Sequence, residues 1–139
     1  MTDLERFVGA QRDVYDDALA ELRAGRKRSH WMWFVFPQIA GLGHSATAQH
    51  YAIANVDEAR AYLEHPVLGA RLRECAQALL GLDGADPVTV LGGIDALKLR
   101  SSMTLFALTA PDEPLWQSVL DKFYAGALDD ATRSRLQQP

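Results

Sequence analysis

The sequence lacks the features of several large protein classes. Its single cysteine, Cys75, cannot form a disulfide within the chain, so stability must come from packing, as is usual in a reducing compartment. No stretch approaches the roughly 18 consecutive apolar residues that cross a bilayer. The first thirty residues also lack an apolar signal segment. We therefore expect a cytoplasmic protein with no membrane partner.

Excess positive charge is also absent. The chain has 14 Lys and Arg against 18 Asp and Glu, a formal net charge of −4, and so lacks the basic field that dominates affinity for nucleic acids. This disfavours a nucleic-acid partner. The four histidines lack the one-face spacing of a helical zinc motif, so we predict no metal and no cofactor. The sequence leaves the oligomeric state open.

Hydrophobic residues make up 48% of the 139-residue chain, which is enough for one core. They recur at spacings of three and four, typical of helices, up to Gly25 and over 55–63, 66–81, 87–92, 94–110 and 115–126. A last short helix is expected from Asp129 or Asp130. Only residues 31–36 are ambiguous between helix and strand. The sequence predicts one all-α domain over residues 1–139, a compact bundle of about six to eight helices. The expected core includes Trp31, Trp33, Phe34, Leu72, Leu105, Phe106 and Val119.

Residues 29–38 are apolar on every side, whichever backbone period is assumed, so this run must be buried. For Trp31 and Trp33 a place in the core is the favoured interpretation. His30 and Gln38 are polar and lie at the two ends of the run, where they need partners or a cavity wall. Because imidazole exchanges protons near neutral pH, His30 is the candidate catalytic residue. A hydrogen-bonded structural histidine is the alternative.

Two elements beside this run are candidates for holding an anion. Lys27 lies in a basic cluster that either complements the carboxyl end of the first helix or contacts an anion. The glycines Gly41 and Gly43 precede a helix that begins near Ser45. They would let backbone amides approach a phosphate or carboxylate, with help from the helix dipole. An ordinary turn capped by Ser45 is equally consistent with this segment.

The segment 94–110 places Asp95, Lys98, Ser102 and Thr109 on one narrow helical stripe bordered by apolar residues. We interpret this stripe as a buried polar seam or a pocket wall. A buried Lys98 needs compensation from Asp95, three residues earlier, or from an anionic ligand. The sequence leaves both open. The solvated face is expected on the broader sector of Ala96, Arg100, Thr104 and Ala107.

The same residues carry a family resemblance. The segments that carry it are Lys27, 29–39, 41–43 with Ser45, 51–53 and 98–106, and they resemble the bacterial family called domain of unknown function 1810. The resemblance covers nearly the whole chain and implies a compact multihelical fold without a settled activity. Members are sometimes labelled calpastatin, a label without weight here because calpastatin acts through disordered segments. The helical pattern is also similar to that of the NADAR proteins, hydrolases that act on ADP-ribose linked to a base.

Two functional hypotheses follow. In the first, the domain binds an anionic nucleotide-like or phosphorylated small molecule in a pocket, and the similarity to NADAR proteins implies hydrolysis of an ADP-ribose-linked N-glycoside. His30 would be catalytic. The ligand-binding candidates, which would converge on one cleft, are Lys27, Trp31, Trp33, Gln38, Gly41, Gly43, Ser45, Lys98 and Ser102. In the second, the chain is a non-catalytic protein-interaction module in which these polar residues only hold the core together.

Overall fold

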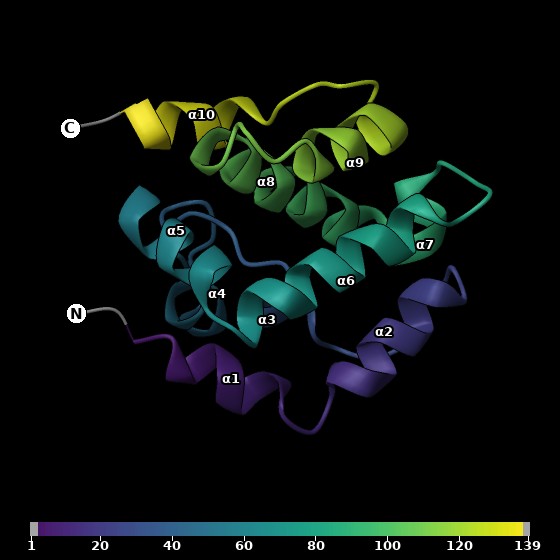
Figure 1. Cartoon of the computed structure of the whole chain (residues 1–139), viewed down its shortest axis with the longest axis horizontal. Helices are drawn as coiled ribbons and strands as arrows, with labels where there is room; N and C mark the ends of the chain where they lie inside the picture. Colours follow the sequence, from purple (N-terminus) through teal and green to yellow (C-terminus); the bar gives the residue numbers. More distant parts are fainter. Residues whose placement is uncertain (1–2, 138–139) are drawn as a thin grey trace.

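Most of the segments with helical periodicity in the sequence form helices in the structure. The computed structural model describes residues 3–137, which hold ten helices and no strand (Figure 1). The helices are α1 (Glu5–Gln11), α2 (Tyr15–Arg23), α3 (Met32–Val35), α4 (Ala46–His50), α5 (Val56–Glu64), α6 (Leu68–Leu80), α7 (Pro87–Leu91), α8 (Gly93–Thr109), α9 (Leu115–Tyr124) and α10 (Asp130–Gln137). The all-α prediction is confirmed. The expected number of six to eight helices is wrong.

The extra helices come from the first third of the chain. The apolar spacing up to Gly25 suggested continuous helix, but the backbone leaves it between α1 and α2, where Val14 has φ −122° and ψ −12°. Buried Gln11 ends α1 and donates its side-chain N–H to the carbonyl of Phe34 at 2.6 Å. This bond holds the end of α1 against α3, while α2 packs on α6 instead. The ambiguous run 31–36 forms the single helical turn α3.

The longest helix, α8, organises the fold. It packs against α9 and α10 on one side, and against α3, α5 and α7 on others. Figure 1 shows α9 and α10 lying together beside α8, with α6 crossing between this group and the pair α1 and α2. Residues 101–106 of α8 are all buried. A helix that is buried on nearly all sides carries apolar and small residues around its whole circumference.

The predicted solvated sector of α8 was wrong. Ala96 and Thr104 are buried, because α9 and the segment before α10 cover this side. Backbone groups of the segment before α10 form hydrogen bonds with this side of α8. Arg100 donates to the carbonyls of Ala127 and Leu128, at 3.0 and 2.8 Å, and the Asp129 N–H donates to the Thr104 hydroxyl. The exposed large side chains of α8 are instead the apolar Ile94, Leu97 and Leu108, which are 74%, 66% and 42% exposed.

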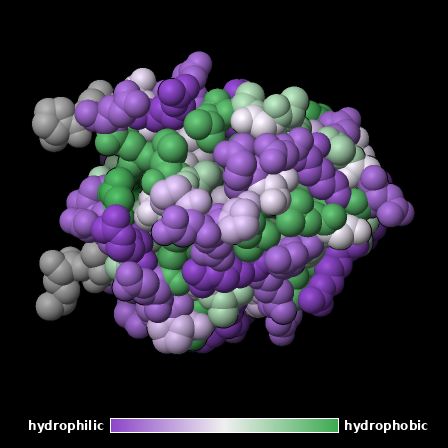
Figure 2. Space-filling model, turned by 45° about the horizontal axis from the view of Figure 1, so that its top comes forward, coloured by the Kyte–Doolittle hydropathy of each residue, from purple (hydrophilic) through white to green (hydrophobic). Residues whose placement is uncertain are grey.

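The predicted core is mostly buried. Trp31, Leu72, Leu105, Phe106 and Val119 are at most 1% exposed. Trp33 and Phe34 are only partly buried. The surface that covers the core is mixed, and Figure 2 shows hydrophobic residues gathered below α10 at the left of the view.

Cys75 lies inside the core, as its helical stripe predicted. Its thiol is fully buried and contacts the Tyr15 hydroxyl at 3.9 Å. Burial raises the pKa of this thiol to about 12, although the contact with Tyr15 acts in the opposite direction. A thiol with so high a pKa is a poor nucleophile at neutral pH.

Two extended segments complete the architecture. Residues 38–40 run parallel to residues 52–54 and are joined by an isolated bridge between Ile39 and Ile53, in which the Ala40 N–H donates to the Ile53 carbonyl at 2.8 Å. This bridge ties the chain on both sides of α4 together and so fixes the base of the loop 41–45. Within residues 3–137, no helix is long and apolar enough to span a membrane.

Candidate functional site

A cavity of about 470 Å³ lies between the loop 42–45 and the exposed face of α8. We call it the Lys98 cavity. Five of the predicted ligand-binding residues line it: Trp33, Gln38, Gly43, Ser45 and Lys98. They come from α3, the loop on either side of the Ile39 bridge, and α8. The remaining wall is formed by Leu42, His44, Ala48, Ile94, Leu97, Ser101, Asp129 and Ala131.

Lys98 is held over an aromatic ring at the wall of this cavity. Its Nζ lies 3.8 Å from the centre of the Trp33 ring, and the Lys98 side chain is 16% exposed. An ammonium so close to a tryptophan face gains a cation–π interaction that strengthens as the group loses water. The contact orients both side chains at the cavity.

One carboxylate serves two lysines beside the cavity. Asp95 Oδ2 lies 2.9 Å from Lys27 Nζ, and its Oδ1 lies 3.3 Å from Lys98 Nζ. All three side chains are mostly buried, with exposures of 10% for Lys27, 17% for Asp95 and 16% for Lys98. The cluster of two cations and one anion therefore keeps one positive charge without a counterion inside it. Of the two alternatives left open for Lys98, the internal pair exists, but it neutralises only one of the two lysines.

Trp31 differs from Trp33 in its surroundings. It is fully buried, and its indole N–H donates to Glu21 at 3.0 Å. Lys27 Nζ lies 5.3 Å from the centre of its ring. Trp31 therefore supports the Lys27 side chain from within the core, and only Trp33 reaches the cavity.

The Glu21 carboxylate fixes the segment that carries Lys27. It accepts hydrogen bonds from the backbone N–H groups of Arg28 and Ser29, from the Ser29 hydroxyl and from the Trp31 indole. Burial raises the pKa of Glu21, but these donors outweigh burial and lower it to about 2.

The glycine loop is shaped by packing. Gly41 has φ +99°, and a Cβ added there would overlap the guanidinium of Arg135, whose Nη2 donates to the Gly41 carbonyl at 3.2 Å. A Cβ on Gly43 would lie 2.6 Å from that of Ala48. The Ser45 hydroxyl accepts the Ala48 N–H at 3.1 Å and so caps α4. Ser45 therefore takes the capping role that was the alternative to anion binding.

Five sequence candidates do not line the Lys98 cavity, namely Lys27, His30, Trp31, Gly41 and Ser102. His30 is exposed and is not part of the wall of the Lys98 cavity. Ser102 is fully buried within α8, and its hydroxyl has no hydrogen-bond partner among residues 3–137. The structure therefore brings Lys98 together with residues 42–45 of the predicted loop 41–45, whereas His30, Ser102 and Gly41 are not part of this wall.

The structure also adds wall residues that the sequence reasoning missed. The sequence indicates Asp129 only as a helix cap, and it does not single out Ser101, Ile94 or Leu97 as ligand contacts. Ser101 and Leu97 lie one helical turn or less from Lys98, so the spacing of α8 offered a signal for them. The position of Asp129 has no such signal, because it depends on how α10 packs on α8.

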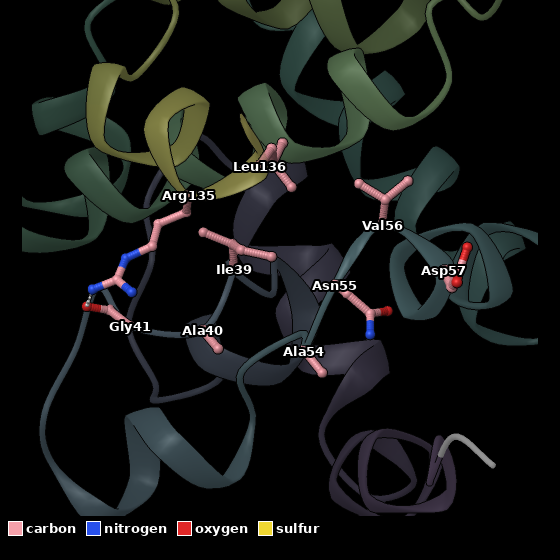
Figure 3. A pocket seen from close by; sticks show the side chains of 9 residues that line it. All are labelled: Ile39, Ala40, Gly41, Ala54, Asn55, Val56, Asp57, Arg135 and Leu136. Atoms are coloured by element: carbon pink, nitrogen blue, oxygen red, sulfur yellow. Dashed lines mark hydrogen bonds between the residues drawn. The ribbon is translucent and has the colours of Figure 1, made fainter. Parts of the chain in front are cut away.

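A second, larger cavity of about 680 Å³ lies between the bridged segments and α10 (Figure 3). Its polar side chains already serve structural roles. Arg135 bonds to Gly41, Asn55 accepts the Glu58 N–H at 2.9 Å as the cap of α5, and Asp57 pairs with Arg60 at 3.3 Å. The guanidinium of Arg135 bonds to a backbone carbonyl and Arg135 is exposed, so the cation of this Arg135 cavity is solvated, whereas Lys98 is mostly buried. Within residues 3–137, no group of three or more His, Cys, Asp or Glu could hold a metal ion.

Comparison with known proteins identifies the family. A model described as "Protein of unknown function (DUF1810)" matches residues 1–136, and the chain belongs to this family. The chain is also similar to the conserved hypothetical protein Rv1873 from Mycobacterium tuberculosis, known from a crystal structure. The two share 47% identity with a TM-score of 0.96, over 99% of this chain and 98% of that one. None of the curated proteins compared matches.

Proposed function

We propose that this protein binds a small molecule with an anionic group, of the nucleotide-like or phosphorylated class, in the Lys98 cavity. The observation that carries this proposal is the sharing of Asp95 by Lys27 and Lys98. A partly buried cation without its own counterion loses hydration, and a phosphate or carboxylate placed against it restores the lost interaction.

The dimensions and wall of the cavity support a small-molecule ligand. Its volume of about 470 Å³ falls in the range of ligand pockets, roughly 300–1,000 Å³. Such pockets combine an apolar lining with a few polar groups that orient the ligand. Here Leu42, Ile94 and Leu97 provide the apolar lining. Lys98, which lies over the Trp33 ring, provides the charged group that orients the ligand.

The proposal concerns ligand binding. Hydrolysis of ADP-ribose-linked bases is one reaction that such a binding site would allow. Cleavage of an N-glycosidic bond benefits from a group that transfers a proton to the leaving base. His30 is not part of the cavity wall, while His44 and Asp129 are. A hydrolase reaction at this cavity would therefore depend on His44 or Asp129.

A thermal-shift titration tests the binding proposal. Inorganic phosphate, AMP, ribose 5-phosphate and ADP-ribose are each titrated against the purified chain. A ligand that binds only the folded state stabilises it by about 2.7 kcal/mol at one hundred times its Kd. We expect at least one of the four to raise Tm in a saturable manner, and the absence of any shift would remove the proposal.

The substitution Lys98→Met tests whether the effect arises at this site. Lys27 remains as the partner of Asp95, so no carboxylate is left unpaired. The free protein loses the ion pair of Lys98 with Asp95 and a cation–π contact of about 0.5–2 kcal/mol. We expect Tm without ligand to fall slightly and the ligand-dependent shift to disappear.

A matched control for this variant is Arg60→Met. Arg60 also pairs with an aspartate three residues earlier, Asp57, but on the exposed surface of α5 and away from the Lys98 cavity. It should retain the full ligand-dependent shift. Equal loss of the shift in both variants would indicate a general charge effect and contradict a site at Lys98.

A second candidate function is the protein-interaction module, favoured by one observation. Ile94 and Leu97 are 74% and 66% exposed although both are large and apolar. Exposed apolar side chains that lie together mark partner surfaces in many proteins. If Ile94→Ser alters the oligomeric state measured by light scattering while ligands cause no Tm shift, this candidate replaces the first.

A further inference from the structure

The Lys98 cavity contains a negative charge as well as its surplus positive charge. Asp129 directly precedes α10 and lines this cavity together with residues of α3 and of the loop 42–45. No ion pair within residues 3–137 joins Asp129 to Lys98. The cavity therefore presents a cation and an anion as separate features, and a ligand that supplies only negative charge would be repelled by one of them.

The hydrogen bonds of Asp129 use one of its two carboxylate oxygens. Oδ2 accepts the N–H of Thr132 at 3.0 Å, the hydroxyl of Thr132 at 2.6 Å and the hydroxyl of Ser101 at 3.3 Å. None of the hydrogen bonds from residues 3–137 goes to Oδ1. These bonds fix the carboxylate at the beginning of α10, and Oδ1 of this cavity-lining residue keeps its capacity to accept hydrogen bonds.

We propose that Asp129 determines specificity by accepting hydrogen bonds from hydroxyl groups of the ligand, while Lys98 contacts its anionic group. The ligand class that satisfies both is a phosphorylated polyol such as a sugar phosphate. This inference rests on the proposed function and narrows it. A carboxylate accepting from hydroxyls forms charge-assisted hydrogen bonds, which are about twice as strong as neutral ones.

The preference for a sugar phosphate follows from the opposite charges of Lys98 and Asp129. A phosphate ester without hydroxyls gains the contact with Lys98, but it brings a like charge near the Asp129 carboxylate and supplies no donor to Oδ1. A sugar phosphate turns the same carboxylate into a favourable contact. Asp129 therefore raises the affinity for ligands with hydroxyl groups and lowers the affinity for anions without them. Removal of its charge should then have opposite effects on the two kinds of ligand.

The experiment compares two phosphate monoesters on the intact chain. Methyl phosphate and ribose 5-phosphate carry the same charged group, and only the second carries sugar hydroxyls. Their Kd values are measured by isothermal titration on the unmodified protein and on Asp129→Asn. Asparagine caps helices about as well as aspartate, so the variant retains the start of α10. The carboxyl charge is the main change.

We expect the unmodified protein to bind ribose 5-phosphate about tenfold more tightly than methyl phosphate, a difference of about 1.4 kcal/mol. In Asp129→Asn the two values should converge, because ribose 5-phosphate weakens while methyl phosphate binds equally well or more tightly. The comparison on the unmodified protein stands even if the variant does not fold.

The outcomes separate this inference from the proposed function. Equal affinity for both esters, lost in Lys98→Met, would overturn the role of Asp129 and leave anion binding intact. A tenfold preference that Asp129→Asn leaves unchanged would also overturn the role of Asp129. Failure of both esters, AMP and ADP-ribose to bind would overturn the anion-binding proposal itself and the role of Asp129 with it.

Discussion

Glu21 shows how a single side chain positions the candidate site. Its carboxylate gathers two backbone N–H groups, a hydroxyl and an indole N–H. These donors hold the backbone on either side of residue 29. Lys27 is thereby directed toward Asp95, and Trp31 is fixed beneath it. The charge state of Glu21 is therefore coupled to the stability of the folded chain.

The pH dependence of stability tests this role. The folded-state pKa of Glu21 is about 2 against an ordinary 4.5, so its contribution is fully present above pH 4.5 and is lost as the pH falls toward 2. We expect Glu21→Gln to have a lower Tm than the unmodified protein at pH 7, with the difference shrinking between pH 4.5 and 2. Thermal melts followed by circular dichroism over this range measure it. A difference that stays constant down to pH 2 would contradict the assignment.

At the scale of an element, the loop 41–45 depends on backbone freedom at one position. Gly41 adopts φ +99°, a region that residues with a Cβ rarely occupy, and the guanidinium of Arg135 lies where that Cβ would be. The Arg135 bond to the Gly41 carbonyl ties the loop to α10. This loop contributes to both cavities, because Gly41 lines the Arg135 cavity and residues 42–45 line the Lys98 cavity.

The substitution Gly41→Ala should strain this loop. A non-glycine residue in such a conformation costs about 1–3 kcal/mol, and displacement of Arg135 adds the loss of its hydrogen bond. Urea unfolding should report this destabilisation. The control is Gly84→Ala in the loop before α7, where a Cβ meets nothing within 4 Å. That variant should change the unfolding free energy by no more than about 0.5 kcal/mol. Equal effects at the two positions would show that Gly41 is not under special constraint.

At the scale of the whole molecule, α8 joins the candidate site to the core. One face carries Asp95 and Lys98 toward the cavity, and Leu105 and Phe106 lie fully buried further along the same helix. The Phe106 ring lies 5.7 Å from those of both Tyr62 on α5 and Trp116 on α9. The Phe106 side chain of α8 thus contacts both α5 and α9 and links these two helices in the core.

Truncation in the middle of α8 should therefore lower the stability of the whole fold. Leu105→Ala leaves a cavity at a position that is 0% exposed, with an expected cost of 2–5 kcal/mol. The comparison is Leu108→Ala on the same helix, which removes the same atoms at a position that is 42% exposed. Its expected cost is below about 1 kcal/mol. If both variants unfold at the same urea concentration, burial does not explain the role of Leu105.

The candidate site was predictable where the local pattern decided it. Lys98 and Asp95 are three residues apart on one helix, so their pairing follows from helical geometry alone. Trp33, Gln38 and Gly43 lie close together in the chain, which favoured a common wall. The second lysine of the cluster was a separate candidate, and its pairing with Asp95 joins residues 68 positions apart. No spacing rule predicts such a contact.

The sequence alone determined the all-helical class, the family and the elements that carry charge near the aromatic run, because these depend on periodicity and on short motifs. Only the tertiary structure decided which side of α8 meets solvent. The sector with Arg100 and Thr104 looked polar, yet backbone groups of residues 127–129 form hydrogen bonds with both side chains, and Thr104 is fully buried. A polar side chain is buried at low cost wherever a distant segment supplies its hydrogen bonds, and residue type does not reveal that segment. The packing of distant segments also decided that Asp129 lines the Lys98 cavity and that His30 does not.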